Sequence, residues 1–330
     1  MMPDTPSTPT AEVSAVPGLT DMIHAMRREI RCVILGQDTV IDQVLAALLA
    51  GGHVLLEGKP GLGKTHLVST LAATFGGASG RIQFTPDLMP SDVTGFRLFD
   101  MNSQTFQLRK GPVFTNLLLA DEINRAPAKT QAALLEVMQE QQVTIDGETL
   151  KLAPPFMTLA TQNPVEHEGT YPLPEAQLDR FIMKVLIDYP GRQAECEIVT
   201  RAAAENPGGF GVGVPLVCGP KEIVAAQAAT VALRIVPEVV AYAVALAQAT
   251  RESRSISLGA GTRGAISLVR IGKAFAALEG RGFVTPDDIK RAALPVLRHR
   301  VQLTPEVAIS GQEVDDVLLA IVESVPAPRS

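Results

Sequence analysis

An eight-residue stretch near residue 60 constrains this chain more than any other feature. It fits the phosphate-binding pattern G-x-x-x-x-G-K-[ST] at every defined position, as Gly58-Lys59-Pro60-Gly61-Leu62-Gly63-Lys64-Thr65. Glycines let such a loop point its backbone N–H groups at phosphates, while the lysine supplies a charge for the β- and γ-phosphates and the hydroxyl reaches Mg²⁺. The stretch therefore predicts a nucleoside triphosphate site, with Lys64 on the phosphates and Thr65 on the metal.

The residues on either side of this loop support the prediction. Residues 53–57 form an apolar run typical of a buried parallel strand, and residues 66–75 can continue as a helix. The helix N-terminus, with His66 just after the loop, would face the bound anion. A glycine-rich turn that matches by chance is the alternative, and the order strand, loop, helix argues against it.

Length and composition set broader limits. A chain of 330 residues is long enough for two domains, and 46% hydrophobic residues can fill both cores. A net charge of −6 argues against a non-specific nucleic-acid binder. Cys32, Cys196 and Cys218 are odd in number and widely spaced, which indicates a reducing compartment without disulfides or zinc. We expect them to be buried apolar side chains, and we expect no structural metal.

Residues 1–18 are rich in Pro, Thr and Ser, and this composition predicts a disordered tail. The tail lacks the basic start and apolar centre of a secretory signal. No uninterrupted apolar run is long enough to span a membrane, and residues 236–250, the nearest to one, are interrupted by polar residues and read as a buried helix. These features favour a cytoplasmic protein.

The remainder divides into two parts by its periodicity. Residues 19–189 alternate strand-like and helical patterns, which is typical of an α/β domain with a parallel sheet. From residue 190 to 330 the strand patterns stop, and an all-α domain is predicted, with a Pro-Gly loop near residues 206–214. Pro237 and Pro286 suit the first helical position, and Thr285 is a predicted N-cap. The predicted helices are 192–204, 220–233, 237–250, 263–278 and 286–297.

Two further strands end in polar residues that suit nucleotide hydrolysis. Residues 116–122 form an apolar strand that ends in Asp121 and Glu122, at the carboxyl edge where open α/β sheets bind ligands. We expect Asp121 to hold Mg²⁺ through water and Glu122 to act as general base. Residues 155–164 form a neighbouring strand whose Asn163 could orient the attacking water. Solvated acids at a strand end are the plainer alternative.

Several long strings together resemble the MoxR family of AAA+ ATPases, and the match covers nearly everything after the tail. A phosphate-binding loop alone would leave many NTPase classes open, whereas these strings are specific. They are residues 83–95 (QFTPDLMPSDVTG), 121–127 (DEINRAP), 160–164 (ATQNP), 168–176 (EGTYPLPEA) and 177–181 (QLDRF).

The resemblance implies an α/β P-loop domain followed by a helical lid, with ATP between them and subunits closed into a ring, usually of six. It implies that Asn163 is the sensor 1 residue and that Arg180 is an arginine finger acting on the neighbouring subunit. Gly36 and Gln37 would lie along the adenine, and Arg263 would be the sensor 2 residue of the lid.

Two of these assignments have alternatives. Arg180 could instead be a helix-end residue paired with Asp179 or Glu175. Arg263 could face solvent, because the family's usual Ser-Pro before this arginine is replaced by Gly261-Thr262.

Two insertions bear on what the protein would contact. Residues 84–108 resemble the family's helix-2 insert, and residues 142–152 predict a hairpin with Asp146-Gly147 at its turn. The resemblance implies that both point toward the axial face of the ring. The alternative is that they are surface loops whose apolar residues, Phe96, Leu98, Phe99 and Met101, pack against the domain.

Three classes of function remain. The resemblance favours an ATPase that remodels or matures protein complexes, typically with a partner that carries a von Willebrand factor A domain. A related nucleic-acid motor would need a basic stripe, which the sequence lacks. A non-hydrolysing scaffold fits poorly with the intact set Lys64, Asp121, Glu122, Asn163 and Arg180. The client complex is not indicated by the sequence.

Overall fold

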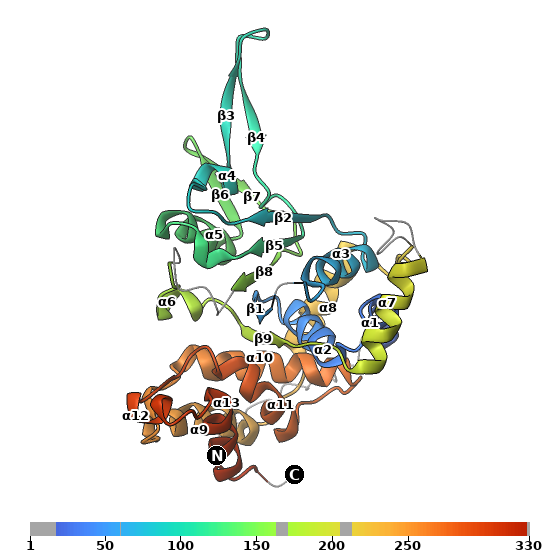
Figure 1. The fold of residues 1–330 in the computed structure, drawn as a ribbon. Helices are drawn as coiled ribbons and strands as arrows, with labels where there is room; N and C mark the ends of the chain where they lie inside the picture. Colours follow the sequence, from blue (N-terminus) through green and yellow to red (C-terminus); the bar gives the residue numbers. More distant parts are fainter. Residues whose placement is uncertain (1–17, 60, 163–170, 205–212, 329–330) are drawn as a thin grey trace, which may run out of the picture.

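The structure is a computed structural model that describes residues 18–59, 61–162, 171–204 and 213–328. Its centre is a five-stranded parallel sheet (Figure 1). The strand order is β2 (Ser79–Gln83), β5 (Leu117–Asp121), β8 (Met157–Gln162), β1 (Val54–Gly58) and β9 (Met183–Ile187). The predicted α/β class is confirmed, and the carboxyl ends of β1, β5 and β8 are neighbours at one edge.

Each face of the sheet is covered by its own apolar cluster. Side chains alternate along a strand, so Val54 and Leu56 of β1 face one cluster and Leu55 faces the other. The second cluster is closed by α4 (Pro90–Thr94), α5 (Ala128–Glu140) and the hairpin of β6 (Gln142–Ile145) and β7 (Glu148–Lys151). The first contains α1 (Leu19–Val33), α2 (Asp38–Leu49) and α3 (Lys64–Thr74). Burial on both faces explains the apolar runs Val54–Leu56 of β1 and Leu117–Ala120 of β5, whereas the edge strand β2 is mostly polar and exposed.

The C-terminal part is helical, as predicted; most of its helices lie along the β9 edge of the sheet, whereas residues 192–204 lie beside α1 (Figure 1). It differs from the prediction by a short antiparallel pair, β10 (Ile256–Leu258) with β11 (Gln302–Leu303), and by two further helices at residues 305–309 and 314–324. Thr285 is the N-cap of α11, and its N–H donates to the Asp288 carboxylate at 2.8 Å. The helices are α7 (Arg192–Ala204), α8 (Pro220–Ala232), α9 (Pro237–Glu252), α10 (Thr262–Leu278), α11 (Pro286–Leu297), α12 (Pro305–Ile309) and α13 (Val314–Ser324).

The helical part and the sheet share one hydrophobic core. Leu45 of α2, Met183 of β9 and Leu268 of α10 belong to the same buried cluster. Asp42 of α2 is also buried and pairs with Arg291 of α11 at 2.8 Å. The apolar contacts therefore continue across residue 190, where the sequence predicted a domain boundary.

Both insertions form antiparallel hairpins. The turn of the β6–β7 hairpin is Asp146-Gly147, with φ of 50° and 82°, as predicted. The other hairpin, β3 (Gly95–Asp100) with β4 (Thr105–Lys110), extends away from the body (Figure 1). The alternative that its apolar residues pack against the domain is wrong, because they lie on an extended two-stranded ribbon beyond the core: Phe96, Leu98, Phe99 and Met101 are all exposed. The axial orientation of the hairpins remains a prediction.

The cysteines are less buried than expected. Cys32 of α1 and Cys196 of α7 are exposed, and only Cys218 is half-buried. Burial raises the pKa of the Cys218 thiol to about 11. The predicted tail, residues 1–18, lies outside the described residues except for Gly18. Among the described helices, none is both long enough and apolar enough to cross a membrane.

Candidate functional site

The phosphate-binding loop connects the end of β1 to the start of α3, as predicted. Gly61 and Gly63 have φ of 81° and 76°, a left-handed backbone that favours glycine. A Cβ at Gly58 would lie 2.4 Å from the Ile187 carbonyl oxygen of β9, so a side chain does not fit there. Lys64 Nζ donates to the Gly58 carbonyl at 2.6 Å, and burial lowers the pKa of this lysine. Pro60 lies outside the described residues.

The two acidic residues lie beside this loop. Thr161 of β8 connects them, because its Oγ donates to Asp121 Oδ1 at 2.8 Å and accepts from the Glu122 N–H at 2.8 Å. Glu122 has φ of 56°, which is strained for a residue with a side chain. A polar cavity of about 210 Å³ opens here. It is lined by Gly58, Gly61, Leu62, Lys64, Thr65, Arg81, Gln83, Asp121, Glu122, Thr161 and Gln162.

Two residues of β2 in this cavity were missed by the sequence reasoning. The register of β2 against β5 places Gln83 opposite Asp121. Arg81 donates to Asp121 Oδ2 through Nε at 3.1 Å and Nη2 at 2.8 Å, and Gln83 Nε2 donates to Glu122 Oε2 at 2.7 Å. Both carboxylates are therefore held by neighbouring donors. The available signal was two polar residues at alternate positions in a strand, which share one face.

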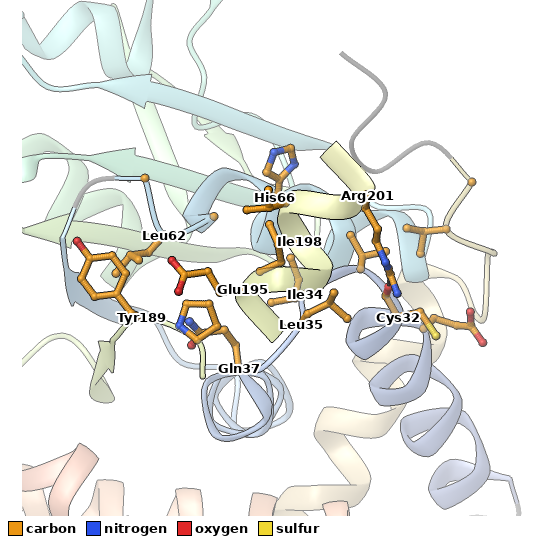
Figure 2. Close-up of a pocket in the computed structure, with 18 of the residues that line it drawn as sticks. Cys32, Ile34, Leu35, Gln37, Leu62, His66, Tyr189, Glu195, Ile198 and Arg201 are labelled. Atoms are coloured by element: carbon orange, nitrogen blue, oxygen red, sulfur yellow. Dashed lines mark hydrogen bonds between the residues drawn. The ribbon is translucent and has the colours of Figure 1, made fainter. Parts of the chain in front are cut away.

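A second, larger cavity of about 500 Å³ adjoins the first, and the two share Gly61 and Leu62 in their walls. Its lining is mainly apolar and comes from the end of α1, the segment before α2, the phosphate-binding loop and α7. Figure 2 shows Leu62 and Tyr189 toward one end and Cys32 with Arg201 toward the other. His66 also lines this cavity.

The predicted adenine segment lies at this cavity. Gln37 lines it and donates from Nε2 to the Asp188 carbonyl at 2.7 Å. Gly36 has φ of 69°, and a Cβ there would lie 2.8 Å from Ala194 Cβ of α7. The close approach fixes the segment against α7. A polar cavity with a lysine and an apolar cavity beside it match the two chemical halves of a nucleotide, the phosphates and the base.

The polar cavity also suits a hydrated Mg²⁺. The metal prefers oxygen ligands, and the Thr65 hydroxyl and the Asp121 carboxylate are both in its wall. Asp121 is paired with Arg81, so a divalent cation would compete with this guanidinium for one carboxylate oxygen. The donor set is chemically suited to Mg²⁺, and Mg²⁺ binding stays a prediction.

Three other predicted site residues are not among the described lining residues of these two cavities. Asn163 lies outside the described residues, one position beyond Gln162 of the polar cavity. Arg180 donates from Nη1 to the Leu135 carbonyl of α5 at 3.0 Å and lines a separate cavity of about 280 Å³. Arg263 has a side chain 61% exposed, with Nη1 3.7 Å from Asp179 Oδ2. Among the described lining residues of the two nucleotide cavities, neither arginine appears.

Comparisons with known proteins identify both parts of the chain. Residues 53–183 match the model of the ATPase family associated with various cellular activities (AAA), and residues 248–321 match an AAA lid domain.

Full-length relatives agree with these matches. Chaperone MoxR1 of Mycobacterium tuberculosis is 39% identical, over 94% of this chain and 85% of that protein. Protein MoxR of Methylorubrum extorquens is 31% identical, over 93% and 96%. A crystal structure of a candidate ATPase from Cytophaga hutchinsonii superposes with a TM-score of 0.87 at 41% identity, covering 94% of this chain and 96% of that one.

Proposed function

Because the chain belongs to the MoxR family of AAA+ ATPases, we propose that it is a Mg²⁺-dependent ATPase whose ATP occupies the two adjoining cavities. The observation that carries this proposal is the wall of the polar cavity, where Lys64 and Thr65 face Asp121 and Glu122. The triphosphate lies in this cavity, and the adenine lies in the apolar cavity beside Gly36 and Gln37.

Each polar residue has a distinct role in this proposal. Lys64 contacts the β- and γ-phosphates, and Thr65 and Asp121 would hold Mg²⁺, which would supply positive charge against the phosphates. Glu122 accepts the proton of the attacking water, and Asn163 orients that water. Gln83 and Thr161 fix the position of Glu122, because they bind its carboxylate and its N–H respectively.

We also propose that the active assembly is a closed ring, most simply a hexamer, in which Arg180 completes the site of a neighbouring subunit. Supporting this, Arg180 emerges from the segment after α6 (Glu175–Leu178), in a separate cavity with Glu136 and Gln177. A guanidinium supplied from outside would stabilise charge on the transferred phosphoryl group. Arg263, beside Asp179, contributes to nucleotide binding as the lid's sensor.

The work of the ring is remodelling or maturation of a protein complex, with a von Willebrand factor A domain protein as partner, in the cytoplasm. The support for a protein client is the net charge of −6 and a relative named as a chaperone. Nucleic acid is the less favoured substrate, because a chain with a net charge of −6 lacks the overall positive field that attracts phosphates.

One variant tests both the chemistry and the client. Glu122→Gln should bind ATP with wild-type affinity but hydrolyse it far more slowly, since an amide cannot accept the proton of water. The ATP-loaded Glu122→Gln assembly is then isolated, and co-purifying proteins are identified by mass spectrometry. Lys64→Ala is the control, because proteins held only by the ATP state should be absent from it.

Each contrary outcome has a defined meaning. Wild-type turnover in Glu122→Gln would move the general base to another residue. Retention of nucleic acid that is lost on raising salt would favour the motor alternative over protein remodelling.

A further inference from the structure

Three consecutive basic residues just after α11 bind backbone carbonyls of the core, and two of them, His299 and Arg300, bind the residue next to Arg180. Arg298 donates from Nη1 to the Lys184 carbonyl at 3.3 Å, and His299 donates from Nε2 to the Phe181 carbonyl at 3.0 Å. Arg300 contacts the carbonyls of residues 179, 181 and 182. These side chains join the helical lid to the core beside Arg180.

Arg300 makes most of these contacts. Its Nη2 donates to Phe181 O at 2.6 Å, its Nη1 donates to Ile182 O at 3.1 Å, and its Nε donates to Asp179 Oδ1 at 2.7 Å. The Arg300 side chain is only 3% exposed. A buried guanidinium with this many fixed acceptors can hold only one arrangement, because its donors are coplanar.

Arg300 also donates to Val296 O and Ser267 Oγ within the lid, whereas its acceptors in the core lie on both sides of Arg180. Asp179 precedes it, while Phe181 and Ile182 follow it and are themselves buried. Arg300, 120 positions later in the chain, thereby fixes the backbone on both sides of Arg180. At its guanidinium end, the described contact is the Leu135 carbonyl.

We propose that Arg300 is a positioning residue, which sets the direction in which Arg180 projects toward the neighbouring subunit and connects that direction to the placement of the subunit's own lid. This inference rests on the proposed function of Arg180 in trans. A shift of α11 moves the three carbonyls and hence the finger, so the placement of each lid affects hydrolysis in the next subunit.

Subunit mixing tests the proposal. An acceptor subunit carries Arg180→Ala and keeps its own Glu122, while a donor subunit carries Glu122→Gln and keeps its own Arg180. ATP hydrolysis arises only where an acceptor site meets a donor finger. Adding Arg300→Lys to the donor keeps the charge but loses the planar set of donors, and it should reduce the rescued turnover by about 10²-fold, as expected for a misplaced catalytic group. Adding it to the acceptor should leave the rescue unchanged.

Arg298→Lys in the donor is the matched control. Its guanidinium is also largely buried at the end of α11, but it binds Lys184 O and Asp315 rather than the residues next to Arg180. It should not reduce the rescue. If the Arg300→Lys chain fails to fold by circular dichroism, Asp179→Asn takes its place, since it removes the carboxylate that Arg300 binds.

The outcomes distinguish the action of Arg180 in trans from the positioning of Arg180 by Arg300. No rescue in the original mixture would reject Arg180 in trans, and the role of Arg300 with it. Rescue that survives Arg300→Lys in the donor would overturn the positioning role alone. An equal loss with Arg300→Lys in donor or acceptor would indicate general damage to folding or assembly and would also overturn it.

Discussion

Replacing Thr161 by valine should weaken both the fold and the activity. The hydroxyl of Thr161 donates to the Asp121 carboxylate and accepts from the Glu122 N–H, each at 2.8 Å. Loss of a hydrogen bond to a charged group costs about 1.5–3 kcal/mol, and an N–H left without its acceptor costs about 1–3 kcal/mol. The added methyl contact returns about 0.8 kcal/mol. The free energy of unfolding should therefore fall by about 3 kcal/mol.

Thr158 offers a matched control on the same strand. Its side chain is fully buried, and among the described residues its hydroxyl has no hydrogen-bond partner. Thr158→Val should leave the free energy of unfolding unchanged or raise it by about 1 kcal/mol, because it removes a buried hydroxyl that makes no described hydrogen bond. The same substitution three residues apart is thus expected to have opposite signs.

The assay is urea unfolding of the nucleotide-free proteins. The unfolding midpoints of variant and wild type are compared, provided that the slope of free energy against urea concentration is the same. Turnover should also fall in Thr161→Val, because Glu122 is held in its left-handed conformation (φ 56°) by the bond that this variant loses. Equal unfolding midpoints for the two valine variants would refute the assignment of Thr161 as the link between the acids.

Two other predictions test the site and the fold. Lys64→Ala should weaken ATP binding by about 100-fold without lowering the thermal midpoint, since it removes a charged phosphate contact from a loop; calorimetry measures the affinity. His53 is buried, its Nδ1 accepts from the Thr158 N–H, and burial lowers its pKa to about 4. A histidine in the unfolded chain has a pKa of about 6.5, so below that pH the unfolded state binds a proton that the folded state does not. The free energy of unfolding should therefore fall by about 3 kcal/mol as the pH is lowered from 6.5 to 4. His53→Gln should flatten that part of the profile, and an unchanged profile would contradict the attribution.

Local sequence signals predicted much of the fold. The helices expected at residues 192–204 and 286–297 have these bounds in the structure, because Pro286 and its N-cap fix a start that depends only on neighbours. The phosphate-binding loop and the two acids are likewise local patterns. Their meeting in one cavity was predictable because parallel strands present their carboxyl ends at a common edge.

The missed features depend on register or on distant partners. Arg81 and Gln83 reach Asp121 and Glu122 only because β2 pairs with β5 in one particular register. A strand of two or three residues, such as β11 or β10, is too short to show a period. Arg300 finds its acceptors about 120 positions earlier in the chain, and no local pattern marks such a contact.

The core that extends from the sheet into the helical lid limits how the protein can be divided. A fragment ending at residue 189 would remove α10 and α11 from the buried cluster that contains Val185 of β9 and Leu48 of α2. Such a fragment is expected to aggregate when expressed, and the lid alone would lose the surface on which it folds. Assigning roles to the two halves therefore requires point substitutions in the intact chain, and exchanging lids between relatives would require exchanging the facing residues of α2 and β9 with them.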